Sequence, residues 1–247
     1  MKISIITITY NSAATVEQTI RSVVSQSYPH VEYLIIDGQS TDDTLTIVKR
    51  YQDKISVVVS EKDQGLYDAL NKGIALATGD VIGILHSDDF YLHDRVLQNY
   101  ADVFLKQKPD AVYSDLYYVD KNDTDKIIRK WKSGEYRPGS FINGWMPPHP
   151  TFFVKKEIYL RYGTFNLSFK SAADYELMLR FIHKHRIKVA YLPEYTVKMR
   201  VGGKSNKNIK NRVNANLEDR RAWEINQLKP RFYTLYLKPL RKLLQFF

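Results

Sequence analysis

Residues Ile82–Phe90 read IGILHSDDF, an apolar run that ends in two adjacent carboxylates. An apolar run of this length, with Gly79 and Asp80 before it, predicts a buried strand that ends near Asp88 and Asp89. In an open α/β sheet, ligands bind at the edge where such strands end. Two neighbouring acids repel each other unless a cation lies between them, and oxygen ligands suit Mg²⁺ or Mn²⁺. The alternative is a solvated turn whose Asp caps the following helix.

Strand-like and helix-like segments alternate along the first ninety residues. The pattern predicts strands at 2–10, 31–37, 55–60 and 81–85, and helices at 12–26, 40–51 and 66–77. Repeated β-α units are typical of a mostly parallel sheet with helices on both faces. Beyond residue 90 we expect helices at 93–107, 154–162, 174–185 and 214–228, and strands at 111–119, 127–131 and 189–192. The Gly- and Pro-rich connection at 133–150 is long, and long connections in compact domains are usually functional.

The composition and the absent motifs narrow the function classes. The chain has 247 residues and no cysteine, which excludes disulfides, thiolate metal sites and cysteine nucleophiles. No run approaches the roughly 18–20 apolar residues of a spanning helix, and the start reads as a strand rather than a signal peptide. Neither G-x-G-x-x-G nor G-x-x-x-x-G-K-[ST] occurs, so a dinucleotide site and a P-loop lack support. We expect a cytoplasmic protein that is not integral to a membrane.

The positive charge is concentrated at the end of the chain. Residues 1–195 contain 24 Lys/Arg and 24 Asp/Glu, whereas residues 196–247 contain 13 and 3. Residues 229–247 interleave these cations with large apolar side chains, which predicts docking on an anionic membrane surface. The alternatives are packing on the domain, packing on a second copy in a homodimer and, least favoured, a nucleic-acid patch.

Three acidic sites follow predicted strands: Asp37, Asp63 and the pair Asp88 and Asp89. A parallel sheet would bring them to one edge, where a divalent ion would let them bind a nucleoside diphosphate leaving group. With these acids, an ordered series of motifs resembles the family 2 glycosyltransferases. The motifs are TYN at 9–11, SVVSQ at 22–26, IIDGQSTD at 35–42, EKDQGLYDALNKG at 61–73, ATGD at 77–80 leading into the acid pair, and SAADYELMLR at 171–180.

The resemblance implies a GT-A fold, a nucleotide-sugar donor, Mn²⁺ or Mg²⁺, and transfer with inversion at the anomeric carbon. It implies a catalytic domain at 1–200, with a nucleotide-sugar half at 1–120 and an acceptor half at 121–200, followed by a helical basic extension at 201–247. By the resemblance, Asp89 is the metal ligand and Asp88 lies near the donor ribose or diphosphate. The other donor-site residues that it implies are Thr9, Tyr10, Asn11, Asp37, Asp63, Gly65, Asn71 and Lys72. Packing is the alternative for Tyr10, and a turn cross-link for Asn71.

Gly38 departs from the family pattern. Many relatives carry at this position a second acid that hydrogen-bonds the nucleobase. The departure weakens the expectation of a UDP-sugar, which stays somewhat favoured.

An inverting transfer needs a base that removes the proton of the acceptor hydroxyl. The resemblance assigns Asp174, with Ala173 in place of the family's Glu. Glu176 is a rival that would point about 200° away on a helix, and a helix cap is the other role open to Asp174. Trp145 and His149 lie between the donor half and this base, and we expect them to contact the acceptor or the diphosphate, with structural packing as the alternative.

The predicted function is non-processive transfer of one sugar to a saccharide acceptor, linked to a polyprenyl diphosphate, in bacterial surface-polysaccharide assembly. The Gln-x-x-Arg-Trp signature of processive relatives is missing. The enzyme would act peripherally on the inner face of the inner membrane. The alternatives are a saccharide- or lipid-binding protein with an inactive donor site, or a sugar-nucleotide nucleotidyltransferase, which would need a Gly-rich basic loop after the first strand.

Overall fold

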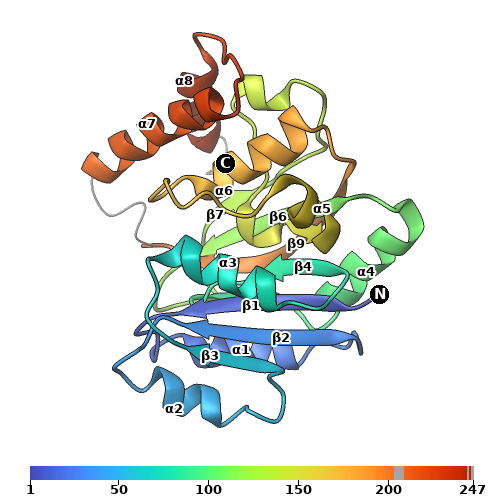
Figure 1. Cartoon of the computed structure of the whole chain (residues 1–247), viewed down its shortest axis with the longest axis vertical. Helices are drawn as coiled ribbons and strands as arrows, with labels where there is room; N and C mark the ends of the chain where they lie inside the picture. The colour runs from blue at the N-terminus through green and yellow to red at the C-terminus, as the bar shows by residue number, and fades with distance from the viewer. Residues whose placement is uncertain (203–208, 244, 246–247) are drawn as a thin grey trace.

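A single mixed sheet organises the molecule (Figure 1). The structure, a computed structural model, describes residues 1–202, 209–243 and 245. In this part of the chain the strand order is β3-β2-β1-β4-β8-β6-β9-β5, with β7 paired on β6. The strands are β1 (Ile3–Thr9), β2 (Val31–Asp37), β3 (Val57–Ser60), β4 (Val81–Ile84), β5 (Asp89–Tyr91), β6 (Ala111–Val119), β7 (Ile127–Trp131), β8 (Phe153–Lys155) and β9 (Val189–Arg200).

The first four strands run parallel and end together. β1 pairs with β2 and β4, and β2 pairs with β3, so that Thr9 lies opposite Asp37 and Asp37 opposite Ser60. The β4–β8, β5–β9, β6–β7 and β6–β8 pairs are antiparallel. The mixed sheet and the shared strand edge confirm the predicted architecture.

Helices cover both faces of the sheet. α1 (Val16–Val24), α2 (Thr44–Lys49) and α4 (Val96–Gln107) pack on one face, and α3 (Leu66–Leu76), α5 (Lys156–Tyr162) and α6 (Ala173–Met178) on the other. α6 continues into the π-helical turn η3 (Leu179–Lys184), and the predicted 133–150 connection holds the short turns η1 (Ser140–Asn143) and η2 (His149–Thr151), the second extending one residue past it. The helix expected at 154–162 begins only at Lys156, because Phe153–Lys155 pair in the sheet.

The last two helices, α7 (Ile209–Ile225) and α8 (Thr234–Leu243), lie at the top of Figure 1. Trp223 is fully buried and its Nε1 donates to the Tyr175 hydroxyl at 2.9 Å, while the Thr234 hydroxyl donates to the Ile142 carbonyl at 2.7 Å. Part of the predicted membrane segment therefore packs on the domain. Leu244, Phe246 and Phe247 of that segment lie outside the described residues. None of the described helices has the length and apolar composition needed to cross a bilayer.

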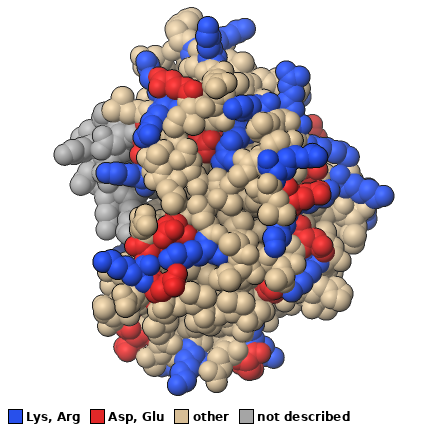
Figure 2. Space-filling model, in the orientation of Figure 1, with Lys and Arg blue, Asp and Glu red and all other residues tan. Residues whose placement is uncertain are grey.

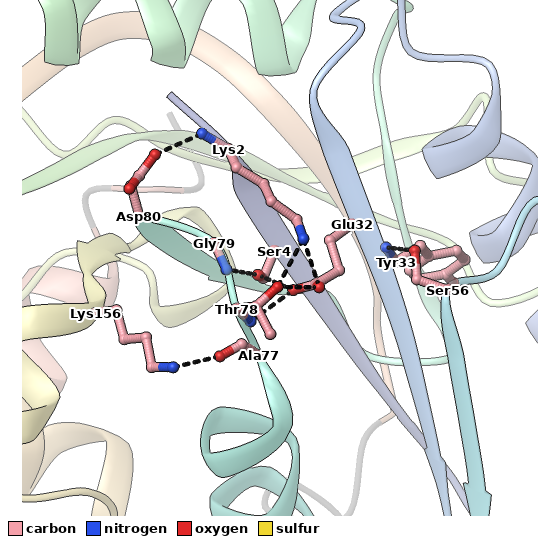
Figure 3. A network of polar contacts seen from close by, with 10 residues as sticks. All are labelled: Lys2, Ser4, Glu32, Tyr33, Ser56, Ala77, Thr78, Gly79, Asp80 and Lys156. Carbon is pink, nitrogen blue, oxygen red and sulfur yellow. Dashed lines mark hydrogen bonds and ion pairs between the residues drawn. The ribbon is translucent and has the colours of Figure 1, made fainter.

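A buried carboxylate links the parallel strands at the end opposite the acids, where the strands begin (Figure 3). Glu32 of β2 accepts hydrogen bonds from Lys2 Nζ at 2.8 Å, the Ser4 hydroxyl at 2.5 Å and the Thr78 backbone N–H at 2.7 Å. The Thr78 hydroxyl also donates to it. The network links β1, β2 and the segment before β4, and leaves the other end of the parallel strands free to form a site.

Candidate active site

The carboxylate of Asp37 holds the strand ends at the donor edge. It accepts hydrogen bonds from the Thr9 hydroxyl at 2.8 Å, the Ser40 hydroxyl at 2.5 Å and the Ser60 hydroxyl at 2.7 Å. Burial raises the pKa of Asp37, but these hydrogen bonds outweigh it and hold the pKa below its ordinary value. Asp37 is fully buried and Thr9 nearly so. The structure gives both residues a scaffolding position and does not support the predicted direct contact with a donor.

Tyr10, Gly38 and Asp63 lie beside one another next to Asp37. The Tyr10 side chain is 58% exposed. A Cβ at Gly38 would lie 2.5 Å from Asp63 Oδ2 and 3.5 Å from the Tyr10 ring. Asp63 therefore fills the space beside Gly38 that a side chain at position 38 would need. Asn11, with φ of 49°, follows Tyr10, and its Oδ1 accepts the Thr41 N–H at 2.9 Å.

The remaining residues predicted for the donor site, Gly65, Asn71 and Lys72, form contacts within the protein. Gly65, with φ of 119°, donates its backbone N–H to Asp63 Oδ1 at 2.9 Å. The Asn71 amide donates to the Phe165 carbonyl and accepts from the Phe165 N–H, both at 2.9 Å, which is a cross-link between segments. Lys72 forms an ion pair with Glu61 at 2.9 Å. The structure thus favours a structural role for Asn71 and does not place Lys72 free to bind a donor.

The acid pair after β4 is split between solvent and core. Ser87 and Asp88 form the tip of a turn in which the Asp89 N–H donates to the His86 carbonyl at 3.0 Å. Asp88 is partly exposed, and Arg200 fixes the turn by donating to the Asp88 carbonyl oxygen. Asp89 instead begins β5, pairs with β9 and is fully buried.

Asp89, the predicted metal ligand, has a buried carboxylate without a partner among the described residues. Both of its carboxylate oxygens are enclosed and have no hydrogen-bond partner in the described part of the chain. Burial, with the neighbouring Asp88, raises the pKa of Asp89 well above its ordinary value. Asp88 is therefore the acid of the pair that meets solvent, and the role of Asp89 as metal ligand stays a prediction.

Two histidines connect this turn to the predicted base. His149 Nδ1 lies 3.3 Å from Asp174 Oδ2, and His149 Nε2 lies 3.2 Å from His86 Nε2. The Tyr67 hydroxyl lies 3.5 Å from Asp174 Oδ1 and accepts the Ala173 N–H at 3.2 Å. These residues come from separate elements, namely α3, the β4–β5 turn, η2 and α6. The structure thus brings together the base and the histidine expected from the sequence, and adds His86 and Tyr67.

The protonation states follow from burial. Burial, together with His149, lowers the pKa of His86 to about 4, and burial lowers the pKa of His149 to about 4. Both imidazoles are therefore uncharged near neutral pH. A neutral His149 that donates from Nδ1 to Asp174 accepts at Nε2 from His86 Nε2–H, which leaves the lone pair of His86 Nδ1 free. Burial raises the pKa of Asp174, whose side chain is 23% exposed and so still meets solvent.

The segment before Asp174 is held by a residue of α7. Glu218 accepts hydrogen bonds from the backbone N–H groups of Lys170, Ser171 and Ala172, each at 2.9 Å. Glu176, the rival base, is 1% exposed and bonded to Arg180 and Asn226 at 2.9 Å. Asp174 is therefore the acid of α6 that faces the cleft.

Trp145 is mainly a core residue. It is 5% exposed, and its Nε1 donates to the Ser133 carbonyl at 2.8 Å. Its ring packs edge-on against Tyr113 and Phe141. The packing alternative describes Trp145 better than a stacking platform for a sugar.

Histidine 86 and Tyr67 were missed as site residues, although both stand inside the quoted motifs. His86 stands two residues before Asp88, at the end of the same predicted strand, and period-two spacing in a strand is the signal that could have identified it. Glu218 and its backbone partners lie 46 to 48 residues apart in sequence, and no local pattern connects them.

Comparisons with known proteins agree with this geometry. The family profile described as "Glycosyl transferase family 2" matches residues 4–175. An uncharacterized glycosyltransferase of Mycobacterium tuberculosis is 30% identical over 180 residues, covering 72% of this chain and 68% of that protein. A PGL/p-HBAD biosynthesis glycosyltransferase of the same species is 26% identical over 200 residues, 76% of this chain and 73% of that protein. A putative teichuronic acid biosynthesis glycosyltransferase of Bacillus subtilis is 38% identical over 97 residues, 38% of each chain.

Solved structures share the fold. TarS of S. aureus in complex with UDP-GlcNAc has a TM-score of 0.70 at 18% identity and covers 92% of this chain, which spans 65% of that one. A mannosyltransferase from Pyrobaculum calidifontis in complex with GDP-Man and Mn²⁺ has a TM-score of 0.68 at 19% identity, over 96% of this chain and 68% of that one. These likenesses confirm the predicted GT-A fold.

Proposed function

The chain belongs to glycosyl transferase family 2 and is a glycosyltransferase, and on that premise we propose an inverting, metal-dependent, non-processive transfer of one sugar. The donor would be a nucleotide sugar, and the acceptor a hydroxyl of a lipid-linked saccharide in surface-polysaccharide assembly. The observation that carries the proposal is the chain of contacts from Asp174 through His149 to His86, beside the turn that carries Asp88.

Asp174 would act as the base. Its raised pKa makes it a better proton acceptor than an ordinary carboxylate. The hydrogen bond from His149 Nδ1 fixes the carboxylate orientation, and the Tyr67 hydroxyl contacts its other oxygen. The acceptor hydroxyl would give its proton to Asp174 as its oxygen attacks the anomeric carbon, and the nucleoside diphosphate would leave on the opposite side.

The donor nucleotide would lie over Tyr10, Gly38 and Asp63. The exposed ring of Tyr10 offers a stacking surface, and the carboxylate of Asp63 can accept a hydrogen bond from a nucleobase N–H. Asp63 would take the place of the acid that Gly38 lacks, which supports a uridine donor. The solved relatives carry UDP-GlcNAc in one case and GDP-Man in the other.

A divalent ion fits at the turn after β4 only if the protein supplies part of its coordination shell. Within the described residues there is no group of three or more His, Asp or Glu side chains that could hold a metal. Mg²⁺ and Mn²⁺ often take one or two carboxylates and complete their shell with substrate phosphates and water. The unpartnered carboxylate of Asp89 would supply a ligand, and the free lone pair of His86 suits Mn²⁺. When bound, the ion would offset the charge of the departing diphosphate.

We propose membrane association from the exposed side chains of α8 and of the segment that precedes it. Phe232 is 90% exposed, Tyr236 67% and Leu240 54%, at a spacing of four residues. Tyr236 and Leu240, four residues apart in α8, lie on one side of the helix, and Phe232 lies in the turn before it. Figure 2 shows Lys and Arg side chains over the same upper part of the molecule, where α7 and α8 lie. Apolar side chains flanked by cations suit an anionic membrane surface.

Replacement of the base tests the proposal. A thermal-shift panel of nucleotide sugars with Mn²⁺ first identifies the donor, because a ligand that binds the native state raises its apparent stability. Asp174→Asn should then lower turnover of that donor by roughly 100-fold or more while donor affinity, measured by calorimetry, stays within about twofold. In the wild type, turnover should fall on the acidic side at a pH above the ordinary Asp value of 3.8, because burial raises the pKa of Asp174.

Glu176→Gln, a change of the rival acid, is the comparison variant. Its turnover is measured relative to the concentration of folded protein. Equal turnover in wild type and Asp174→Asn would remove Asp174 from the mechanism. Donor binding without any donor hydrolysis or transfer in the wild type would favour the binding-protein alternative.

A further inference from the structure

A small cavity lies on the acceptor side of the molecule, between β7, the loop after η1 and α8. Its volume is about 170 Å³. Four cations line it, Lys130 and Lys132 from the β7 side and Lys238 and Arg241 from α8. No acidic side chain contributes to the lining within the part of the chain that the structure describes. We call this cavity the basic pocket.

Three of the four cations form no ion pair within the described part of the chain, and of these Lys132 interacts electrostatically with the carboxylate of Asp115. Lys238 is paired with Asp219 at 2.6 Å. Lys130, Lys132 and Arg241 form no ion pair with any residue of 1–202, 209–243 or 245. Like charges that face one cavity repel each other, and a bound anion relieves that repulsion. The charge arrangement therefore favours an anionic ligand.

The wall formed by α8 is fixed close to the domain. A Cβ at Gly144, where φ is 73°, would lie 2.5 Å from the Lys238 backbone nitrogen. Only a glycine at this position lets the α8 backbone approach so closely. The cations of α8 are therefore held over the pocket by backbone packing.

The basic pocket lies beside the base. Lys238 Nζ is 3.6 Å from the ring centroid of Tyr175, the residue that follows Asp174. Positions 236 and 240 of α8 are exposed, whereas 238 and 241 line the pocket. One side of α8 thus presents apolar side chains to solvent, and the other presents cations to the cavity.

We propose that the basic pocket binds a phosphate or diphosphate group, and that this group belongs to the acceptor. The cavity is too small for a whole saccharide, since sites for drug-sized ligands measure roughly 300–1,000 Å³, and it suits one compact anion. Lys and Arg side chains are the usual partners of phosphate oxygens. The assignment to the acceptor rests on the proposed function, whereas the phosphate site itself does not.

The test measures binding without the transfer reaction. Pyrophosphate is titrated into the full chain in EDTA, with intrinsic tryptophan fluorescence as the signal, because Trp131 and Trp145 line the pocket. Calorimetry provides the second readout. The triple variant Lys130→Gln, Lys132→Gln, Arg241→Gln should bind pyrophosphate roughly tenfold or more weakly than the wild type. Rising salt should weaken wild-type binding, because ions screen exposed charges.

A matched control removes the same number and type of charged side chains from another part of the surface. Lys49→Gln, Arg50→Gln, Lys54→Gln removes two lysines and one arginine around α2, at the opposite end of the molecule in Figure 1, and should bind like the wild type. The charge-preserving variant Lys130→Arg, Lys132→Arg, Arg241→Lys should retain binding. Equal affinity in all variants, or no binding by the wild type, would overturn the phosphate site.

Vesicles separate the two sources of phosphate. Vesicles of anionic phosphatidylglycerol and of neutral phosphatidylcholine are compared for the wild type and the pocket variant. If only pyrophosphate binding is lost in the variant, the phosphate belongs to a substrate, as proposed. If binding to anionic vesicles is lost to the same extent, the ligand is a lipid headgroup and the assignment to the acceptor is wrong. Neither result depends on Asp174 or on turnover.

Discussion

Replacing Glu32 with glutamine should destabilise the protein strongly and in a pH-dependent way. The Glu32 carboxylate accepts hydrogen bonds from Lys2, Ser4 and Thr78 at the edge of the sheet away from the site (Figure 3). A glutamine amide can accept on only one side, and its NH₂ would face groups that also donate. The substitution keeps the shape of the side chain and removes its charge.

The size of the effect follows from the pKa. Burial alone would raise the pKa of Glu32, but the hydrogen bonds from Lys2, Ser4 and Thr78 lower it from 4.5 to about 2. At 1.36 kcal/mol per pKa unit, this lowering contributes about 3 kcal/mol to the free energy of unfolding near neutral pH. Because the folded-state pKa is depressed, the contribution is present above pH 4.5 and is lost as the pH falls toward 2. About 2 kcal/mol should remain at pH 3.5.

Urea unfolding of wild type and Glu32→Gln at pH 7 and pH 3.5 measures this contribution. The difference should be about 3 kcal/mol at pH 7 and should shrink by about 1 kcal/mol at pH 3.5. Asp53→Asn, which changes an exposed acid between α2 and β3, is the control and should leave stability unchanged at both pH values. A Glu32→Gln difference that is below about 1 kcal/mol, or that does not depend on pH, would refute the reasoning.

Two further predictions concern the site and the core. Asp89→Asn should weaken Mn²⁺-dependent donor binding roughly tenfold or more, as calorimetry with and without Mn²⁺ would show, and equal metal dependence in the variant and the wild type would remove Asp89 from the metal site. Gly83→Ala should lower the free energy of unfolding by about 1–3 kcal/mol, because the new Cβ would lie 2.4 Å from the Phe153 ring, and an unchanged urea midpoint would contradict this packing.

The pattern of apolar and polar residues in the sequence was sufficient to predict the layers of the fold. Apolar runs bounded by turn residues predicted β6 and β7 with the bounds that the structure has, and the acids after the early strands were correctly expected at one edge. These features depend on local composition and on the alternation of β and α units, which a sequence carries directly. β9 was predicted over 189–192 and extends to Arg200, because its later residues pair with β5 and β6. Such pairing partners are far away in the chain.

The roles within the site depended on tertiary structure. Asp88 and Asp89 are equivalent in composition, but a turn at Ser87 and Asp88 starts β5 at Asp89, and successive strand residues point to opposite faces. Asp37 looked available until its three hydroxyl partners were brought around it. His86 joined the site only because η2 places His149 against it, 63 residues later in the chain.

The sequence by itself determined the β-α order, the family motifs and the choice of Asp174, because each is written in neighbouring residues. The tertiary structure alone decided which acid meets solvent, which polar groups satisfy one another, and where the cations of α8 and β7 converge. Burial and the pairing of distant segments determine these outcomes, and both arise only when the chain has folded.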